Sequence, residues 1–205
     1  MSEEKANPKQ GVVVDPPFTL ASGSPRRREL LAELLDDYEV FPTDAEELDF
    51  HPEGPLALVM ENARLKTLAV AELRPKAWVL GADTLVALGD ETFGKPADLV
   101  EAAAMLRRLS GKTHEVSTGL CLTCKAAGYE ESRVTTSRVT FKELDDETIT
   151  AYFAEVNPLD KAGAYAIQTR ADLIVESFAG SRSNVIGLPL EDLGAWLTEV
   201  GITLE

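Results

Sequence analysis

The sequence predicts an α/β fold in which a mixed, twisted sheet is flanked by helices. Two observations support this prediction. Apolar runs with the length of buried strands alternate along the chain with segments of helical periodicity. In addition, two long β-rich segments, residues 115–124 and 129–141, are joined at Ala127 and Gly128, as is typical of a hairpin. A hairpin among interleaved helices and strands favours a mixed sheet over a purely parallel one.

Local signals define the elements of the N-terminal half. Residues 18–21 form a short apolar run that predicts a first buried strand. Ser24 suits the N-cap of the next helix and Pro25 suits its first position, and leucines then follow at helical spacing. A second helix is expected over residues 55–73, and a strand is expected over residues 78–82.

The C-terminal half contains further caps. Asp98 and Glu101 form the pattern of a capping box, which predicts the start of a third helix. After the hairpin, Asp145 or Asp146 is expected to cap another short helix. The remaining expected elements are a strand over residues 173–178 and a final helix over residues 190–200.

The length of 205 residues suits one domain or two closely joined lobes. We expect a single domain over residues 18–205, preceded by a flexible tail of residues 1–17. The tail is polar and charged, and its one apolar run, residues 12–14, is too short for a signal-peptide core or a membrane span.

The net charge of −15 limits the partners of this protein. An acidic surface repels a phosphate backbone, so we expect no binding of DNA or RNA polymers. A small anionic ligand requires either locally concentrated positive charge or a metal ion that offsets the repulsion.

Cys121 and Cys124 form a C-x-x-C pattern within a predicted strand. Residues three apart on a strand point to opposite faces, which suits neither a disulfide nor a shared metal ion. We therefore expect two ordinary thiols in a reducing, cytoplasmic compartment.

The turn at residues 22–27 is the first candidate site, because it leads into a helix N-terminus, where backbone N–H groups favour an anion. Arg26 and Arg27 lie in the first helical turn, where the helix dipole favours acids, and this placement indicates a phosphate ligand. The alternative is a solvated basic turn.

Asp83 and Thr84 follow the predicted strand of residues 78–82. A carboxylate in this place suits a divalent metal or accepts a proton from water, although it also suits a simple turn cap. Lys95, between a glycine and a proline, is a candidate phosphate-binding charge. Taken alone, Lys66 suits a solvated helix face and Glu47 an acidic surface run.

Seven separated motifs follow one another along the sequence. They are ASGSPRR (residues 21–27), the helix bearing Lys66, GADT (81–84), GKP (94–96), LSGKTH (109–114), DKAGAYAIQ (160–168) and NVIGLPL (184–190). Each motif alone is a weak signal, whereas seven in order are hard to obtain by chance. In this order they resemble the Maf proteins, which are nucleotide pyrophosphatases related in fold to the inosine triphosphate pyrophosphatases. The resemblance runs from about Leu20 to Leu197.

The resemblance implies two lobes around a central cleft, dependence on Mg²⁺ or Mn²⁺, a homodimer, and hydrolysis of a nucleoside triphosphate to its monophosphate and pyrophosphate. GADT and the late AGAY-x-IQ resemble the dTTP/UTP pyrophosphatase branch, whereas the branch acting on 7-methyl-GTP typically carries GSDQ. One departure is Ala166, which stands where a glycine is usual before Ile167 and Gln168.

The resemblance also implies residue roles. Asp83 matches the catalytic carboxylate, and Glu47 matches an acid that assists Asp83 in metal binding. The positions matching triphosphate-binding residues are Ser22, Arg26, Arg27, Lys66 and Lys95. The positions matching base selection are Arg26, Thr84 and Gln168.

Two alternatives stay open at this stage. One is a pyrophosphatase with another substrate, such as 7-methyl-GTP, another modified purine nucleotide or a modified pyrimidine nucleotide. The other is a non-enzymatic, nucleotide-binding regulator of septum formation, and a link to cell-division arrest is compatible with either activity. The presence of Asp83, Lys95 and the arginine pair favours an enzyme.

Overall fold

The computed structural model describes residues 18–203, so the expected tail of residues 1–17 lies outside the described residues. Within residues 18–203, seven strands form one sheet in the order β2-β1-β3-β5-β6-β7, with β4 paired to β3. They are β1 (Phe18–Leu20), β2 (Tyr38–Val40), β3 (Trp78–Leu88), β4 (Glu91–Phe93), β5 (Thr113–Cys124), β6 (Tyr129–Phe141) and β7 (Val175–Ala179). β1 is parallel to β2 and β3, and the other pairs are antiparallel, so the predicted mixed sheet is confirmed.

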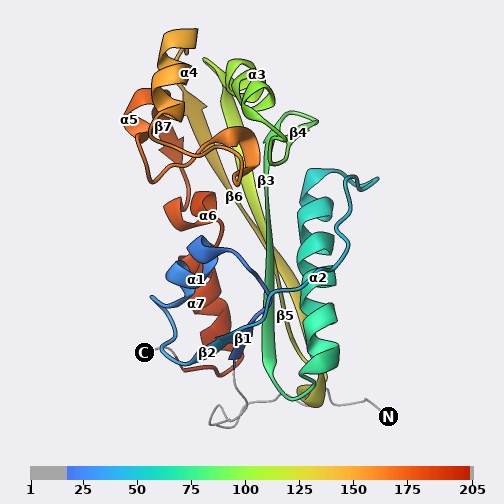
Figure 1. Ribbon diagram of the computed structural model, residues 1–205. Coiled ribbons are helices and arrows are strands. Elements are labelled where there is room, and N and C mark those ends of the chain that lie inside the picture. Colours follow the sequence, from blue (N-terminus) through green and yellow to red (C-terminus); the bar gives the residue numbers. More distant parts are fainter. Residues whose placement is uncertain (1–17, 204–205) are drawn as a thin grey trace, which may run out of the picture.

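Helices pack on both faces of the sheet (Figure 1). They are α1 (Pro25–Leu31), α2 (Pro55–Leu73), α3 (Leu99–Leu109), α4 (Asp146–Phe153), α5 (Ala171–Ile174), α6 (Arg182–Ile186) and α7 (Leu190–Glu199). Figure 1 shows α1 and α7 on one side of the long strands and α2 on the other, with α3, α4 and α5 at the upper end. None of the described helices is long and apolar enough to cross a membrane.

Two large hydrophobic cores lie along the long strands β3, β5 and β6, and a smaller third cluster lies between α2 and the sheet. The lower core includes Leu80 and Trp196, and the upper core includes Phe141 and Tyr152, all with no exposed surface. Because the same strands run through both cores, the two lobes share one sheet. The expected two-lobed architecture is therefore present.

The predicted helix caps are confirmed. The side chain of Ser24 accepts from the Arg27 N–H at 3.4 Å, Asp98 accepts from Glu101 at 2.8 Å, and Asp145 caps α4. Each cap satisfies a backbone donor that the first helical turn leaves without a partner. The two cysteines are buried free thiols, as expected.

Two predictions about strand boundaries were wrong. The strand predicted over residues 173–178 is present as β7, but it starts only at Val175, because the first residues of the predicted range belong to helix α5. A short apolar run does not distinguish a buried helical turn from a strand, and Ile174 is buried in the upper core.

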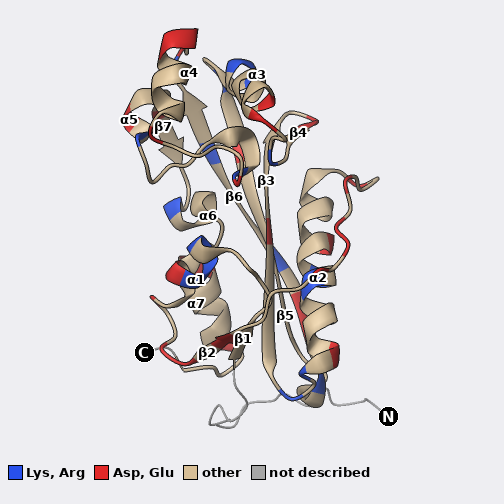
Figure 2. Ribbon diagram, viewed as in Figure 1, with Lys and Arg blue, Asp and Glu red and all other residues tan. Residues whose placement is uncertain are grey.

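The second error concerns Asp83, which was expected after the end of a strand. β3 continues to Leu88, because β5 pairs with it without interruption from Val79 to Ala87. Asp83 therefore lies in mid-strand, opposite Gly119, and Figure 2 shows an acidic segment inside β3 and not only at the ends of the strands.

Two glycines let α2 lie directly against the sheet. A Cβ atom on Gly81 would lie 2.6 Å from the Ala63 carbonyl oxygen, and one on Gly119 would lie 2.8 Å from the Met60 nitrogen. Both distances are far inside van der Waals contact, so only glycine permits this separation of helix and sheet.

We expect Gly119→Ala to lower the free energy of unfolding by about 1–3 kcal/mol, since the added methyl group overpacks the contact with α2. Urea denaturation followed by circular dichroism measures the change. Gly94→Ala is the control, because a Cβ atom there meets nothing within 4 Å. Equal stability of the two variants would contradict the close contact.

Candidate active site

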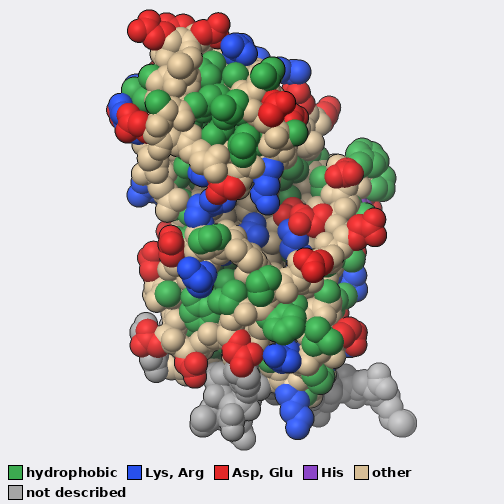
Figure 3. Space-filling view, viewed as in Figure 1, with side chains coloured by type: hydrophobic (Ala, Val, Ile, Leu, Met, Phe, Trp, Pro, Cys, Tyr) green, Lys and Arg blue, Asp and Glu red, His purple; other side chains and the backbone are tan. Residues whose placement is uncertain are grey.

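A cleft of about 780 Å³ lies between the two lobes, beside the middle of β3. The space-filling view in Figure 3 shows basic and acidic side chains gathered in this central hollow. All site residues predicted from the sequence line the cleft, namely Ser22, Arg26, Arg27, Glu47, Lys66, Asp83, Thr84, Lys95 and Gln168. Their roles stay predictions, but their proximity is a property of the fold.

The charge of the cleft differs in sign from that of the whole chain. Five cationic side chains and four carboxylates line it, whereas the chain has a net charge of −15. This local excess of positive charge suits an anionic ligand. The lining ionic residues are Arg26, Arg27, Lys66, Lys95, Lys161, Glu47, Asp49, Asp83 and Asp160.

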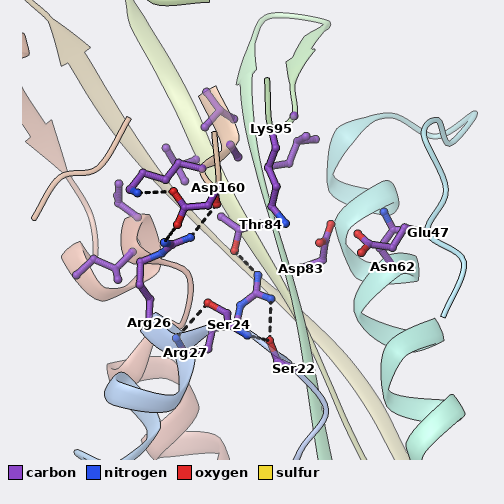
Figure 4. A pocket seen from close by; sticks show the side chains of 18 of the residues that line it. Ser22, Ser24, Arg26, Arg27, Glu47, Asn62, Asp83, Thr84, Lys95 and Asp160 are labelled. Atoms are coloured by element: carbon purple, nitrogen blue, oxygen red, sulfur yellow. Dashed lines mark hydrogen bonds and ion pairs between the residues drawn. The ribbon is translucent and has the colours of Figure 1, made fainter. Parts of the chain in front are cut away.

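Arg27 is held in a fixed orientation by neutral groups. Its Nη1 donates to Ser22 Oγ at 3.4 Å and its Nη2 to Thr84 Oγ1 at 2.9 Å (Figure 4). Its Nε donates to the Gly187 carbonyl oxygen at 2.9 Å. Burial lowers the pKa of Arg27 from its ordinary value, while the charges of Asp83 and Glu47 oppose that change. Because arginine stays protonated in proteins and two of its five N–H groups have no partner within residues 18–203, Arg27 offers charge and donors to an anion.

Arg26 points to a different partner. Its Nη1 lies 2.6 Å from Asp160 Oδ2, and its Nη2 donates to the Asp160 carbonyl oxygen at 3.0 Å. Burial raises the pKa of Asp160, but the hydrogen bonds and charges of Lys161 and Arg26 outweigh this and hold that pKa below its ordinary value. The ion pair therefore joins α1 to the loop before the AGAY segment, across the cleft.

Lys66 joins the two carboxylates that were predicted to bind metal. Its Nζ lies 2.8 Å from Glu47 Oε2 and 2.8 Å from Asp83 Oδ1. The lysine and Asp83 are mostly buried, with side-chain exposures of 12% and 15%, whereas Glu47 is half exposed. A single ammonium therefore holds both carboxylates on one side of the cleft.

Asn62 positions the loop that carries Glu47. Its side-chain oxygen accepts from the Leu48 N–H at 2.7 Å, and its side-chain nitrogen donates to the Leu48 carbonyl oxygen at 3.0 Å. Asn62 is only 4% exposed, so this pair of bonds is shielded from water. Asn62 was not predicted as a site residue, because an asparagine inside a helix has no local signature of a loop contact.

Lys95 lies on the loop after β4 and points into the cleft toward Asp83 (Figure 4). Among the described residues, its side chain forms no hydrogen bond or ion pair. It therefore resembles Arg27 in lacking a carboxylate partner, and a bound anion meets both positive charges without displacing an acid.

Gln168 lines the cleft from the upper lobe and is exposed. The hydroxyl of Tyr152 accepts from the Ala166 N–H at 2.9 Å and donates to the Ala166 carbonyl oxygen at 3.2 Å, which anchors the segment before Gln168. Ala166 does not have a positive φ, so this backbone position does not require glycine. The departure from the usual sequence is compatible with the loop.

Several residues that support the site were not predicted from the sequence. Asp160 lies in a recognised motif, but nothing in the motif indicates that it pairs with Arg26. The Thr118 hydroxyl contacts the Thr84 hydroxyl and donates to the Asn184 carbonyl oxygen, and these three residues are far apart in the sequence. The only sequence signal was the occurrence of Asp160 and Asn184 within matched motifs.

The donor set fits a metal ion that binds together with substrate. Within residues 18–203, no three His, Cys, Asp or Glu side chains come close enough to hold a metal by themselves. Glu47 and Asp83 supply two carboxylates, and Mg²⁺ commonly uses one or two carboxylates plus phosphate oxygens and water. The geometry thus suits a metal whose other ligands come from a phosphate chain.

Comparison with known protein families shows to which family this chain belongs. The family described as Maf-like protein matches residues 17–200 of this chain. The chain belongs to the Maf family. A family member from Myxococcus xanthus, named dTTP/UTP pyrophosphatase, is 49% identical over 187 residues, which cover 91% of this chain and 94% of the relative. A protein of the same name from Thermococcus gammatolerans is 45% identical over 174 residues, covering 85% and 91% of the two chains.

A solved structure supports the fold of this Maf protein. The Ham1 protein of Staphylococcus aureus superposes with a TM-score of 0.56 and 16% sequence identity, covering 89% of this chain and 98% of that chain. At this identity the likeness concerns the fold alone. The expected fold class, a mixed sheet flanked by helices, is therefore confirmed.

We expect Asn62→Ala to weaken activation by Mg²⁺ by about tenfold, the usual effect of removing a residue that orients a metal-binding side chain. The reason is that Glu47 loses the support of the Leu48 contacts. The measurement is the Mg²⁺ concentration for half-maximal turnover, with turnover at saturating Mg²⁺ as the control. An unchanged Mg²⁺ requirement would show that Asn62 does not position Glu47.

Proposed function

We propose that this Maf protein hydrolyses dTTP and UTP to the nucleoside monophosphate and pyrophosphate. The observation that carries the proposal is the arrangement of the cleft. The carboxylates of Glu47 and Asp83 lie on one side, held by Lys66. Arg27 and Lys95, which have no carboxylate partner in the part of the chain that the structure describes, face the same space. The names of the relatives from Myxococcus xanthus and Thermococcus gammatolerans support the choice of reaction and base.

The chain's own residues account for binding of the triphosphate. Arg27 has two N–H groups that remain for phosphate oxygens, and Lys95 supplies a mobile point charge. The Arg27 backbone N–H already donates to the Ser24 side chain, so this N–H does not bind the anion. The Arg27 side chain binds the anion instead. In this arrangement the phosphate chain lies between α1 and the loop after β4.

Asp83 is the proposed proton acceptor. A water molecule attacks the α-phosphorus in line with the leaving group, and its proton passes to the Asp83 carboxylate. The new bond joins the water oxygen to phosphorus, and the bond to the bridging oxygen of pyrophosphate breaks. Lys66 restrains Asp83 through the 2.8 Å contact, so the carboxylate does not rotate away from the water.

Glu47 and Asp83 are the residues that would hold the divalent metal, with Mg²⁺ or Mn²⁺ as the expected ion. When bound, the metal polarises phosphoryl oxygens and offsets their negative charge. The contribution of the protein is to keep both carboxylates on the same side of the cleft, through Lys66 and through the Asn62 contact with the loop of Glu47.

Base selection is assigned to residues on both lobes. Gln168 offers a side-chain amide that both donates and accepts, which suits the edge of a pyrimidine base. Thr84 and Arg26 border the same cleft, and the GADT motif matches the pyrimidine branch. We further propose that the enzyme acts in the cytoplasm and as a homodimer.

We expect Asp83→Asn to retain the fold and lose at least about 100-fold in kcat, in line with removal of a general base. The amide occupies the same volume but accepts a proton poorly. Pyrophosphate release measures turnover, and an unchanged thermal midpoint within a few degrees serves as the control for folding. Near-wild-type turnover would remove Asp83 from the chemistry.

The substrate is tested by pyrophosphate release from a panel of nucleoside triphosphates. We expect release from dTTP and UTP with Mg²⁺ or Mn²⁺, and loss of release when a chelator is added. Release of pyrophosphate chiefly from 7-methyl-GTP would agree with the proposed mechanism, but it would overturn the assignment of Thr84 and Gln168 to the selection of a pyrimidine base. No release from any nucleotide would instead favour a non-enzymatic, nucleotide-binding regulator.

A further inference from the structure

A chain of hydrogen bonds runs from the cleft into the sheet behind it. Arg27 Nη2 donates to Thr84 Oγ1 at 2.9 Å, and the hydroxyl oxygens of Thr84 and Thr118 are 3.0 Å apart. Thr118 Oγ1 then donates to the Asn184 carbonyl oxygen at 3.1 Å. Thr118 and Asn184 are fully buried, and Thr118 is not part of the cleft wall.

The groups at the two ends of this series of hydrogen bonds decide which group is the donor in each bond. A guanidinium only donates, and a backbone carbonyl only accepts. Thr118 gives its one hydrogen to Asn184, so it must accept from Thr84. Thr84 therefore gives its hydrogen to Thr118 and presents a lone pair to Arg27. The order is thus Arg27, Thr84, Thr118, Asn184, with each group donating to the next.

The far end of the chain is itself anchored. The side-chain nitrogen of Asn184 donates to the Val116 carbonyl oxygen and to Ser137 Oγ, both at 2.9 Å, which fastens α6 to β5 and β6. Gly187, directly after α6, accepts from Arg27 Nε at 2.9 Å. The same short helix therefore supports the guanidinium twice, once directly through Gly187 and once through the two threonines.

Gly187 also borders these groups. A Cβ atom at this position would lie 3.4 Å from Thr84 Oγ1 and 3.6 Å from Arg27 Nε, which are ordinary van der Waals contacts. Its φ of +127°, and not a lack of space, is what favours glycine here. The backbone conformation at Gly187 thus places its carbonyl oxygen within hydrogen-bond distance of Arg27 Nε, beside the Thr84 hydroxyl.

We propose that Thr118 is a positioning residue that orients Arg27 through Thr84. By accepting the Thr84 hydrogen, Thr118 keeps a lone pair of Thr84 directed at Arg27, and the remaining N–H groups of Arg27 stay directed at the phosphates. Without the Thr118 hydroxyl, the Thr84 hydroxyl rotates freely and its hydrogen competes with Arg27 for the same space. The proposal rests on the proposed function, because it assumes that Arg27 binds the triphosphate.

The test compares two threonines of the same strand. Thr118→Val removes the hydroxyl and keeps the shape, and we expect the KM for dTTP to rise about tenfold with a smaller change in kcat. Thr118→Ser, which retains a hydroxyl, should restore most of the affinity. Thr123→Val is the matched control, because Thr123 is 2% exposed and donates to the Tyr129 carbonyl oxygen outside the cleft.

A merely structural role predicts a different pattern. In that case Thr118→Val and Thr123→Val would lower the thermal midpoint by similar amounts and shift the KM equally or not at all. A rise in KM for both variants, or for neither, would overturn the proposal. Our expectation is a rise in KM for Thr118→Val alone.

A second background tests whether the effect passes through Arg27. Arg27→Lys lacks the planar group that Thr84 binds, so adding Thr118→Val to it should change the KM by less than about twofold. A full tenfold effect in that background would show that Thr118 acts by another route.

A third measurement does not depend on turnover. Exchange of the Arg27 Nε–H with water, followed by NMR, should be faster in Thr118→Val than in the wild type and unchanged in Thr123→Val. If the wild-type protein cleaves no nucleotide, the proposed function fails, and this exchange rate still decides the positioning role. An exchange rate that Thr118→Val leaves unchanged would overturn it.

Discussion

The contact between α2 and the centre of the sheet is the constraint on which the site depends. Gly81 and Gly119 leave room for the helix backbone, and the Thr67 hydroxyl, next to Gly81, lies 2.8 Å from the Ala63 carbonyl oxygen of α2 and 3.1 Å from the Cys121 carbonyl oxygen of β5, so its one hydrogen is shared between helix and sheet. This separation brings Lys66 within 2.8 Å of Asp83, in the middle of β3. A methyl group on either glycine would push the helix outward, and the lysine would then reach the carboxylate poorly.

Charge within the cleft is divided into paired and unpaired groups. Lys66 is shared by two carboxylates, and Arg26 is occupied by Asp160, whereas Arg27 and Lys95 have no carboxylate partner among residues 18–203. An incoming phosphate chain therefore meets two cations that need not release an acid first. An enzyme with a strongly acidic surface can bind a polyanion in this way, because the positive charge is concentrated locally in the cleft.

The arginine pair of α1 links the two lobes in different ways. Arg26 reaches the loop at Asp160, which belongs to the upper lobe, while Arg27 turns to Thr84 and to the backbone after α6. Neighbouring residues on a helix point in directions about 100° apart, so adjacent arginines naturally serve different partners. The cleft is thereby bounded on one side by a single short helix that contacts both lobes.

By itself, the sequence determined the local elements and the family. Short-range hydrogen bonding and periodicity determine the helix caps at Ser24, Asp98 and Asp145, the extent of α2 and the hairpin. Seven ordered motifs indicated membership of the Maf family. Only the tertiary structure decided that Asp83 lies in mid-strand, since that depends on the partner strand β5. The same holds for the groups that orient the arginines, because Asp160 and Gly187 lie 134 and 160 residues from their arginine partners. Hydrogen bonds over such separations leave no pattern in the local sequence, and they form only when the sheet and α6 bring these segments together.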